Sequence, residues 1–159
     1  MSDDDLQNIA KYIMPSIPAC ASDLGFLFGT RHGVPEFCEV AHFLWQNGMF
    51  SRLLVSGGRT GSSPLAEAEI IAEARAAEVM DRAAIESIVV IGKICSTRRY
   101  LMTLQRHWPG LSLSVCPVNY FNIPAERWHE HDKFRARVLS EFDKIPRYVA
   151  EGFLEEING

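Results

Sequence analysis

The chain has 159 residues, enough for one domain with its own core, and its 47% hydrophobic content is typical of a globular protein. Its formal net charge of −4 argues against a nucleic-acid partner or an acidic membrane surface, and no apolar run reaches the roughly 18 residues of a membrane span. Residues 1–5 are acidic, whereas a secretory signal begins with basic residues, so we expect a cytoplasmic protein.

Predicted helices and strands alternate along the chain. Residues 3–14 place apolar residues on one helical face, and the apolar run 24–28 predicts a strand that ends at Gly29. The remaining elements are helices over 35–47, 64–84 and 96–108, strands over 53–56, 88–91 and 111–116, and a mostly helical stretch over 124–154 that is interrupted before Pro146. This alternation predicts a three-layer α/β/α domain with a Rossmann-like parallel sheet.

We expect this single domain to cover residues 1–159. An N-terminal helical segment (1–20) precedes the sheet, and a C-terminal helical segment (120–159) is expected to pack on it. Ligands of such parallel sheets bind at the carboxyl ends of the strands, so the residues there are the first candidates for a site.

A glycine-rich loop follows the strand over 53–56 and leads into the next predicted helix. Gly57 and Gly58 allow a sharp turn and a close approach by a ligand, and Arg59 adds a positive charge. The helix that follows begins near Pro64 and directs its free N–H groups toward the same loop. The segment predicts an anion pocket for a phosphate or carboxylate, with a ligand-free strand-to-helix turn as the alternative.

Polar residues also follow two other strands, and parallel strands bring their carboxyl ends to one edge. The candidate ligand-binding residues are Gly29, Thr30, Arg31, Ser56, Gly57, Gly58, Arg59, Glu67, Lys93 and Arg98. Arg98 and Arg99 point in different directions on a helix. We therefore assign Arg98 to the site, and we expect substitution of Arg99 to have little effect. Glu67 in a first helical turn and His32 in the first loop are the candidate acid–base groups. The competing interpretations are solvated turn cations and a solvated glutamate.

The cysteines favour no metal centre. They are widely spaced without a CxxC pair, and buried thiols are the simplest interpretation of all of them: Cys20, Cys38, Cys95 and Cys116. Cys95 alone has basic neighbours in sequence that would lower the pKa of a reactive thiol.

Several of these segments resemble one bacterial family. The segments that carry the resemblance are Gly29 with the arginine that follows it, Asn47-Gly48, 53–58, 66–69, Gly92-Lys93, 98–104, Trp108-Pro109, 145–148 and Gly152-Phe153. From Asp23 onward the chain resembles the domain found in YdcF, SanA and ElyC, and it is most similar to the cytoplasmic YdcF branch. The resemblance implies a Rossmann-like sheet with a polar cleft at its strand ends and S-adenosylmethionine as the cofactor to test.

The chain departs from that family in one segment. Members carry a further strand and an Asn-Thr…Glu-Asn motif after the helix that holds Glu67, and here residues 66–84 lead directly to the strand at 88–91. Either the segment is naturally deleted or the sequence omits it near residues 74–77. A sheet that is one strand short would expose an apolar edge, so we expect a homodimer.

Two functions follow from the sequence. The first is a small-molecule-binding protein, with enzymatic activity left open, for a phosphate- or carboxylate-bearing ligand such as a nucleotide or S-adenosylmethionine. The second is a degenerate, non-catalytic module that binds a ligand or a protein.

Overall fold

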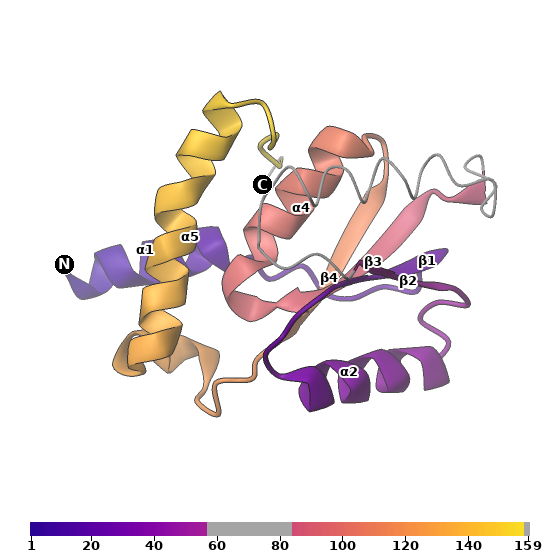
Figure 1. The fold of residues 1–159 in the computed structure, drawn as a ribbon, viewed down its shortest axis with the longest axis horizontal. Helices are drawn as coiled ribbons and strands as arrows, with labels where there is room; N and C mark the ends of the chain where they lie inside the picture. Colours follow the sequence, from indigo (N-terminus) through magenta and orange to yellow (C-terminus); the bar gives the residue numbers. More distant parts are fainter. Residues whose placement is uncertain (57–83, 158–159) are drawn as a thin grey trace.

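The computed structural model describes residues 1–56 and 84–157. All strands of the described sheet run parallel, in the order β2-β1-β3-β4 (Figure 1). The elements are α1 (Asp3–Ile13), β1 (Leu24–Phe28), α2 (Val34–Gln46), β2 (Leu53–Ser56), β3 (Ser87–Lys93), the 3₁₀ turn η2 (Ile94–Ser96), α4 (Thr97–His107), β4 (Ser112–Val118), η3 (Ala125–Glu130) and α5 (Asp132–Ala150). The three-layer α/β arrangement predicted from the alternation is confirmed.

Strand β3 lies inside the sheet and is buried on both faces. Its side chains alternate, so Val89 and Ile91 pack toward α2 while Ile88 and Val90 pack toward α4. Both faces of a strand in a parallel sheet are covered by helices, which explains the uninterrupted apolar run of this segment. The first polar side chain after that run is Lys93, which ends the strand at the sheet edge.

Strands β1 and β3 are neighbours, and the chain leaves them in opposite directions. After β1 it passes to α2 on one face, whereas after β3 it passes to α4 on the other face. Leu27 pairs with Ile91, so Gly29 and Lys93 follow on adjacent strands at the same edge. This divergence marks the position where ligands bind in open α/β sheets. The expectation that Gly29 and Gly92 share one edge is confirmed; Gly57, the third glycine of that expectation, lies outside the described residues.

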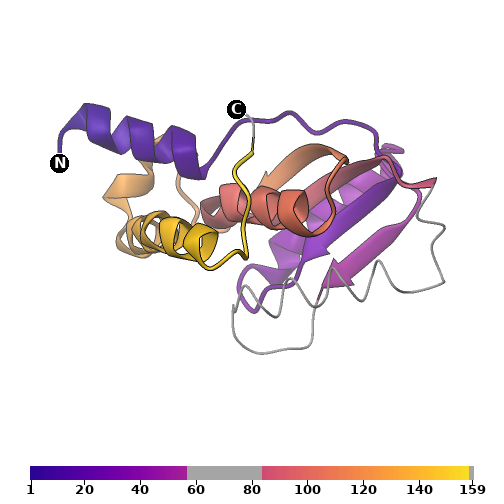
Figure 2. The ribbon, with the colours of Figure 1, turned by 90° about the horizontal axis from the view of Figure 1, so that it is seen from above.

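The C-terminal segment packs beside the carboxyl end of the sheet. Helix α5 packs on α1, η2 and η3, and Figures 1 and 2 show α1 and α5 on the side of α4 that faces away from β2. These elements enclose a second core around Trp128 and Phe134, which are almost fully buried. Within residues 120–157, helix α5 thus packs on the turn that follows β3, next to the carboxyl end of the sheet.

Two boundaries differ from the sequence expectation. Helix α5 continues through Pro146, where an interruption was expected. Proline removes the hydrogen bond to the carbonyl four residues earlier, which here belongs to the exposed Phe142, so solvent can reach that turn. Strands β3 and β4 also extend two residues further toward the carboxyl edge than the apolar pattern indicated. Within the described residues, no helix combines the length and apolarity required to cross a bilayer.

We predict that Gly92→Ala destabilises the protein. A Cβ atom at this position would lie 2.5 Å from the ring of Tyr100, which is buried and stacked on Phe28 with ring centroids 4.1 Å apart. The ring cannot move without disrupting that stack, so we expect a loss of about 1–3 kcal/mol in the free energy of unfolding. Chemical denaturation measures it, with exposed Gln46→Ala as a control that changes stability by less than about 0.5 kcal/mol. Equal stability of the two variants would contradict the packing argument.

Candidate functional site

The carboxyl ends of β1 and β2 are joined by one side chain. The hydroxyl of Ser56 is buried and accepts a hydrogen bond of 3.1 Å from the backbone N–H of Gly29. In the loop that follows β1, Thr30 donates to the carbonyl of His32 and accepts from its N–H, at 2.7 and 3.0 Å. This turn is stabilised by its own side chain, and it presents Arg31 and His32 to solvent.

The start of α2 is pressed against the segment that follows β4. Gly33 has a left-handed backbone with φ of 67°, and a Cβ atom there would lie 2.6 Å from Tyr120. Glycine is required both for the backbone angle and for this close approach. The contact holds the loop after β1 next to the half-buried Tyr120 at the carboxyl edge.

Lys93 ends β3 where the chain diverges from β1 and β3. It is half-buried, and no hydrogen-bond or ion-pair partner for its ammonium group exists among residues 1–56 and 84–157. Burial lowers the pKa of Lys93, and the guanidinium groups of Arg137 and Arg99 act in the same direction. Partial burial of an ammonium group that has no acceptor among the described residues raises the free energy of the folded state. An anion bound beside the group would remove that penalty.

Cys95 lies in η2, the turn that follows Lys93, and it is unsuited to nucleophilic chemistry. It is buried, and this burial raises the pKa of the thiol despite the nearby Lys93 and Arg137. Burial also raises the pKa of the half-buried Tyr120, to about 12. Both groups therefore stay protonated at neutral pH, and the sequence expectation that basic neighbours activate Cys95 is not supported.

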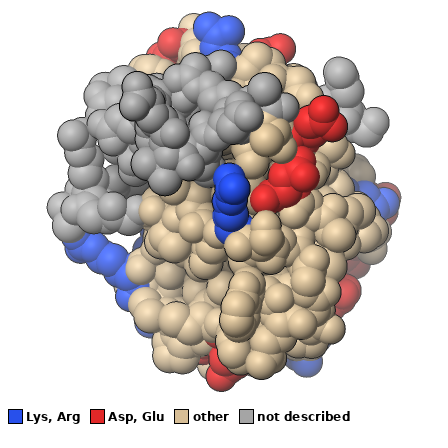
Figure 3. Space-filling model, turned by 90° about the vertical axis from the view of Figure 1, so that its right-hand side faces the viewer, with Lys and Arg blue, Asp and Glu red and all other residues tan. Residues whose placement is uncertain are grey.

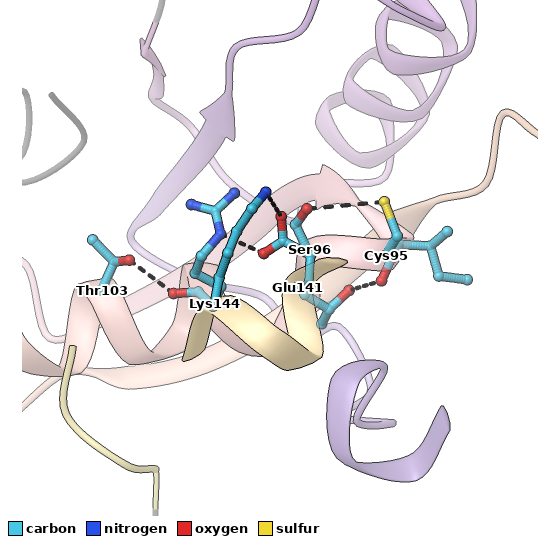
Figure 4. A network of polar contacts seen from close by, with 8 residues as sticks. Cys95, Ser96, Thr103, Glu141 and Lys144 are labelled. Atoms are coloured by element: carbon cyan, nitrogen blue, oxygen red, sulfur yellow. Dashed lines mark hydrogen bonds and ion pairs between the residues drawn. The ribbon is translucent and has the colours of Figure 1, made fainter. Parts of the chain in front are cut away.

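A buried carboxylate connects α4 to α5 beside the same edge. Glu141 binds the Nε atom of Arg99 at 2.5 Å and the ammonium of Lys144 at 3.5 Å (Figure 4). Arg99 and Glu141 are both buried, and the carbonyl of Arg99 also accepts a hydrogen bond of 2.8 Å from Thr103. Buried charges of this kind require a partner, so the pair fixes the position of α5 relative to α4.

Arg98 occupies a different place from the one that we assigned from the sequence. Its guanidinium donates to the carbonyl of Tyr12 at 3.3 Å, forms an ion pair with Glu156 and lies 4.0 Å from the centroid of the Tyr12 ring. Arg98 therefore attaches α1 and the C-terminal residues to α4. Arg99, which we expected to be near-neutral on substitution, is instead buried and paired with Glu141 of α5.

The structure brings part of the predicted site together. Gly29, Thr30, Arg31, Ser56 and Lys93 gather at one edge of the sheet. The remaining candidates Gly57, Gly58, Arg59 and Glu67, like the predicted helix over 64–84, lie outside the described residues. The sequence analysis did not identify the neighbouring side chains Tyr120, Arg137 and Glu141. The spacing of charges at 137, 141 and 144, on one face of a helix, was the signal that could have found two of them.

No set of three described His, Cys, Asp or Glu side chains is arranged to hold a metal ion. Comparison of the chain with models of known protein families, with curated proteins and with solved structures found no match.

We predict that Arg99→Ala destabilises the protein more than Arg98→Ala does. Loss of Arg99 leaves the buried carboxylate of Glu141 poorly compensated, which typically costs about 3–5 kcal/mol. Loss of Arg98 removes the partner of Glu156, but that side chain is already half exposed to water. We therefore expect the free energy of unfolding to fall by only about 1 kcal/mol. Chemical denaturation of both variants tests the order. The double variant Arg99→Met/Glu141→Leu should recover most of the stability, and the reverse order of the single variants would contradict the assignment.

Proposed function

We propose that this protein binds a small molecule through a phosphate or carboxylate group at the carboxyl ends of β1 and β3. The observation that carries the proposal is Lys93, a half-buried cation with no acceptor among the described residues, at the point where the chain leaves the two neighbouring strands in opposite directions. The exposed Arg31 adds a second positive charge to the loop after β1. The ligand class is a molecule that bears a phosphate or carboxylate, and a nucleotide and S-adenosylmethionine are the compounds to test.

The resemblance to the YdcF, SanA and ElyC domain supports the same location. Its polar cleft is expected at the strand ends, and its YdcF branch is linked to S-adenosylmethionine. We propose a cytoplasmic location, which is that of the YdcF branch that the chain resembles. The proposal concerns binding. A reaction would need an acid–base group, for which the exposed His32 is the described candidate and Glu67 the other.

We predict that Lys93→Met weakens ligand binding by about tenfold, because a charge-assisted contact is lost. Calorimetric titration with S-adenosylmethionine and with adenosine monophosphate measures the effect. Lys133→Met, at an exposed position of α5, is the matched control and should bind as the wild type does. Thermal unfolding of both variants establishes that they are folded. Failure of the wild-type protein to bind either compound, and inorganic phosphate as well, would contradict the proposed function.

A second function, a module that binds a protein partner, is favoured by a different surface. Leu53 and Val55 of β2 are 41% and 57% exposed, and β2 stands at one end of the described sheet. Phe43 and Trp45 near the end of α2 are also exposed. Figure 3 shows the right-hand side of the molecule as drawn in Figure 1, where the described residues expose few charged side chains. Exposed apolar side chains on an outer strand favour association, and we propose a second copy of the chain as the partner.

We predict a homodimer at micromolar concentration. Light scattering of the wild-type protein should report twice the monomer mass of 17.9 kDa. Val55→Lys should shift the protein to the monomer, because it places a charge among these exposed apolar side chains. Phe142→Lys, at an exposed position of α5, is the control and should leave the mass unchanged. A wild-type monomer at high concentration would rule out the dimer.

A further inference from the structure

We propose that Arg137 of α5 joins Lys93 to form a subsite for a dianionic phosphate group at the carboxyl end of β3. This inference rests on the proposed function, because it identifies part of that same site and narrows its ligand to a phosphorylated molecule. It adds a residue from a helix far along the chain, which the strand-end pattern did not indicate.

The packing of α5 brings Arg137 to this position. Helix α5 packs on η2, the turn that directly follows Lys93. Glu141 and Lys144 of α5 face α4 in the network of Figure 4, and Arg137 lies one turn before Glu141 on the same side of the helix. Arg137 is exposed to solvent, and its guanidinium influences the pKa of Lys93, Cys95 and Tyr120, which agrees with a position near the end of β3.

The charges at this position do not balance. Glu141 is the one described carboxylate that acts on Lys93, and its two oxygens already bind Arg99 and Lys144. Neither Lys93 nor Arg137 has an ion-pair or hydrogen-bond partner in the described part of the chain. Two cations near the carboxyl end of β3, one half-buried and one exposed, therefore have no anionic partner of their own among the described residues. Water screens the repulsion at the exposed Arg137, and an anion bound between the two would remove the remainder.

A phosphate monoester fits this pair better than a carboxylate. Its charge of about −1.5 to −2 at neutral pH matches two cations, whereas a carboxylate compensates one. The guanidinium fork of Arg137 can donate two hydrogen bonds to phosphate oxygens, and the ammonium of Lys93 supplies a compact point charge. Tyr120 stays protonated at neutral pH, so it adds no negative charge that would compete with a bound phosphate. The two test compounds differ in this respect, because adenosine monophosphate carries a phosphate whereas S-adenosylmethionine carries a carboxylate.

The experiment is a titration of the ¹⁵N-labelled protein with inorganic phosphate, followed by NMR at a slightly alkaline pH where phosphate is a dianion. We expect the signals of Lys93, of the Arg137 side chain and of Tyr120 to shift with saturation, and acetate to produce much weaker shifts. Arg137→Gln and Lys93→Met should each weaken phosphate binding by about tenfold, and Lys93→Arg, which keeps the charge, should retain most of it. The matched control is Arg135→Gln, on the same helix, where the arginine pairs with Asp132.

Two results would overturn the inference. One is phosphate binding that Arg137→Gln leaves unchanged while the variant is folded. The other is tight binding of S-adenosylmethionine by a protein that does not respond to phosphate, which would leave the proposed function intact and reject the phosphate subsite. Absence of binding to phosphate, adenosine monophosphate and S-adenosylmethionine would instead reject both. Phosphate binding that needs both cations would support the subsite even if no nucleotide binds.

Discussion

The architecture depends on the double-sided burial of β3. A strand covered by α2 on one face and by α4 on the other has no exposed position for a polar side chain until it reaches its end. The apolar run therefore determines where the first charge can stand, and that charge is Lys93. Its neighbour β1 is followed by a helix on the opposite face, so the chain diverges beyond the two strand ends. Fold and candidate site thus follow from the same constraint.

The second core determines what else reaches this edge. Its position relative to the sheet depends on a buried ion pair between Arg99 and Glu141. Such a pair contributes little net stability compared with an apolar contact, yet it permits few alternative arrangements, because every displacement leaves a buried charge uncompensated. We interpret this pair as the device that sets the orientation of α5. The side of α5 that carries Glu141 is consequently held next to η2, the turn that follows Lys93.

The sequence predicted the sheet and its polar edge well, because both follow from local signals. Apolar runs that end in glycine or lysine mark buried strands and their ends, and parallel pairing then brings Gly29 and Lys93 together. The roles of Arg98 and Arg99 could not be predicted in this way. Helical periodicity separates their directions by about 100°, but it does not say which direction faces α5 and which faces α1. The position of Arg137 relative to β3 could not be predicted from the sequence for the same reason, because it depends on how two distant segments pack.

The attachment of α1 has a kinetic consequence. The hydroxyl of Tyr12 donates to Glu156, a residue 144 positions later, and Arg98 between them binds both. Helix α1 packs on α4 and α5, so its contacts close loops that span most of the chain, and the entropy of loop closure opposes them until those partners are in place. We expect α1 to be the last helix to dock during folding and the first to detach from the native state. Native-state hydrogen exchange would show this as lower protection in α1 than in β3, and equal protection would refute it.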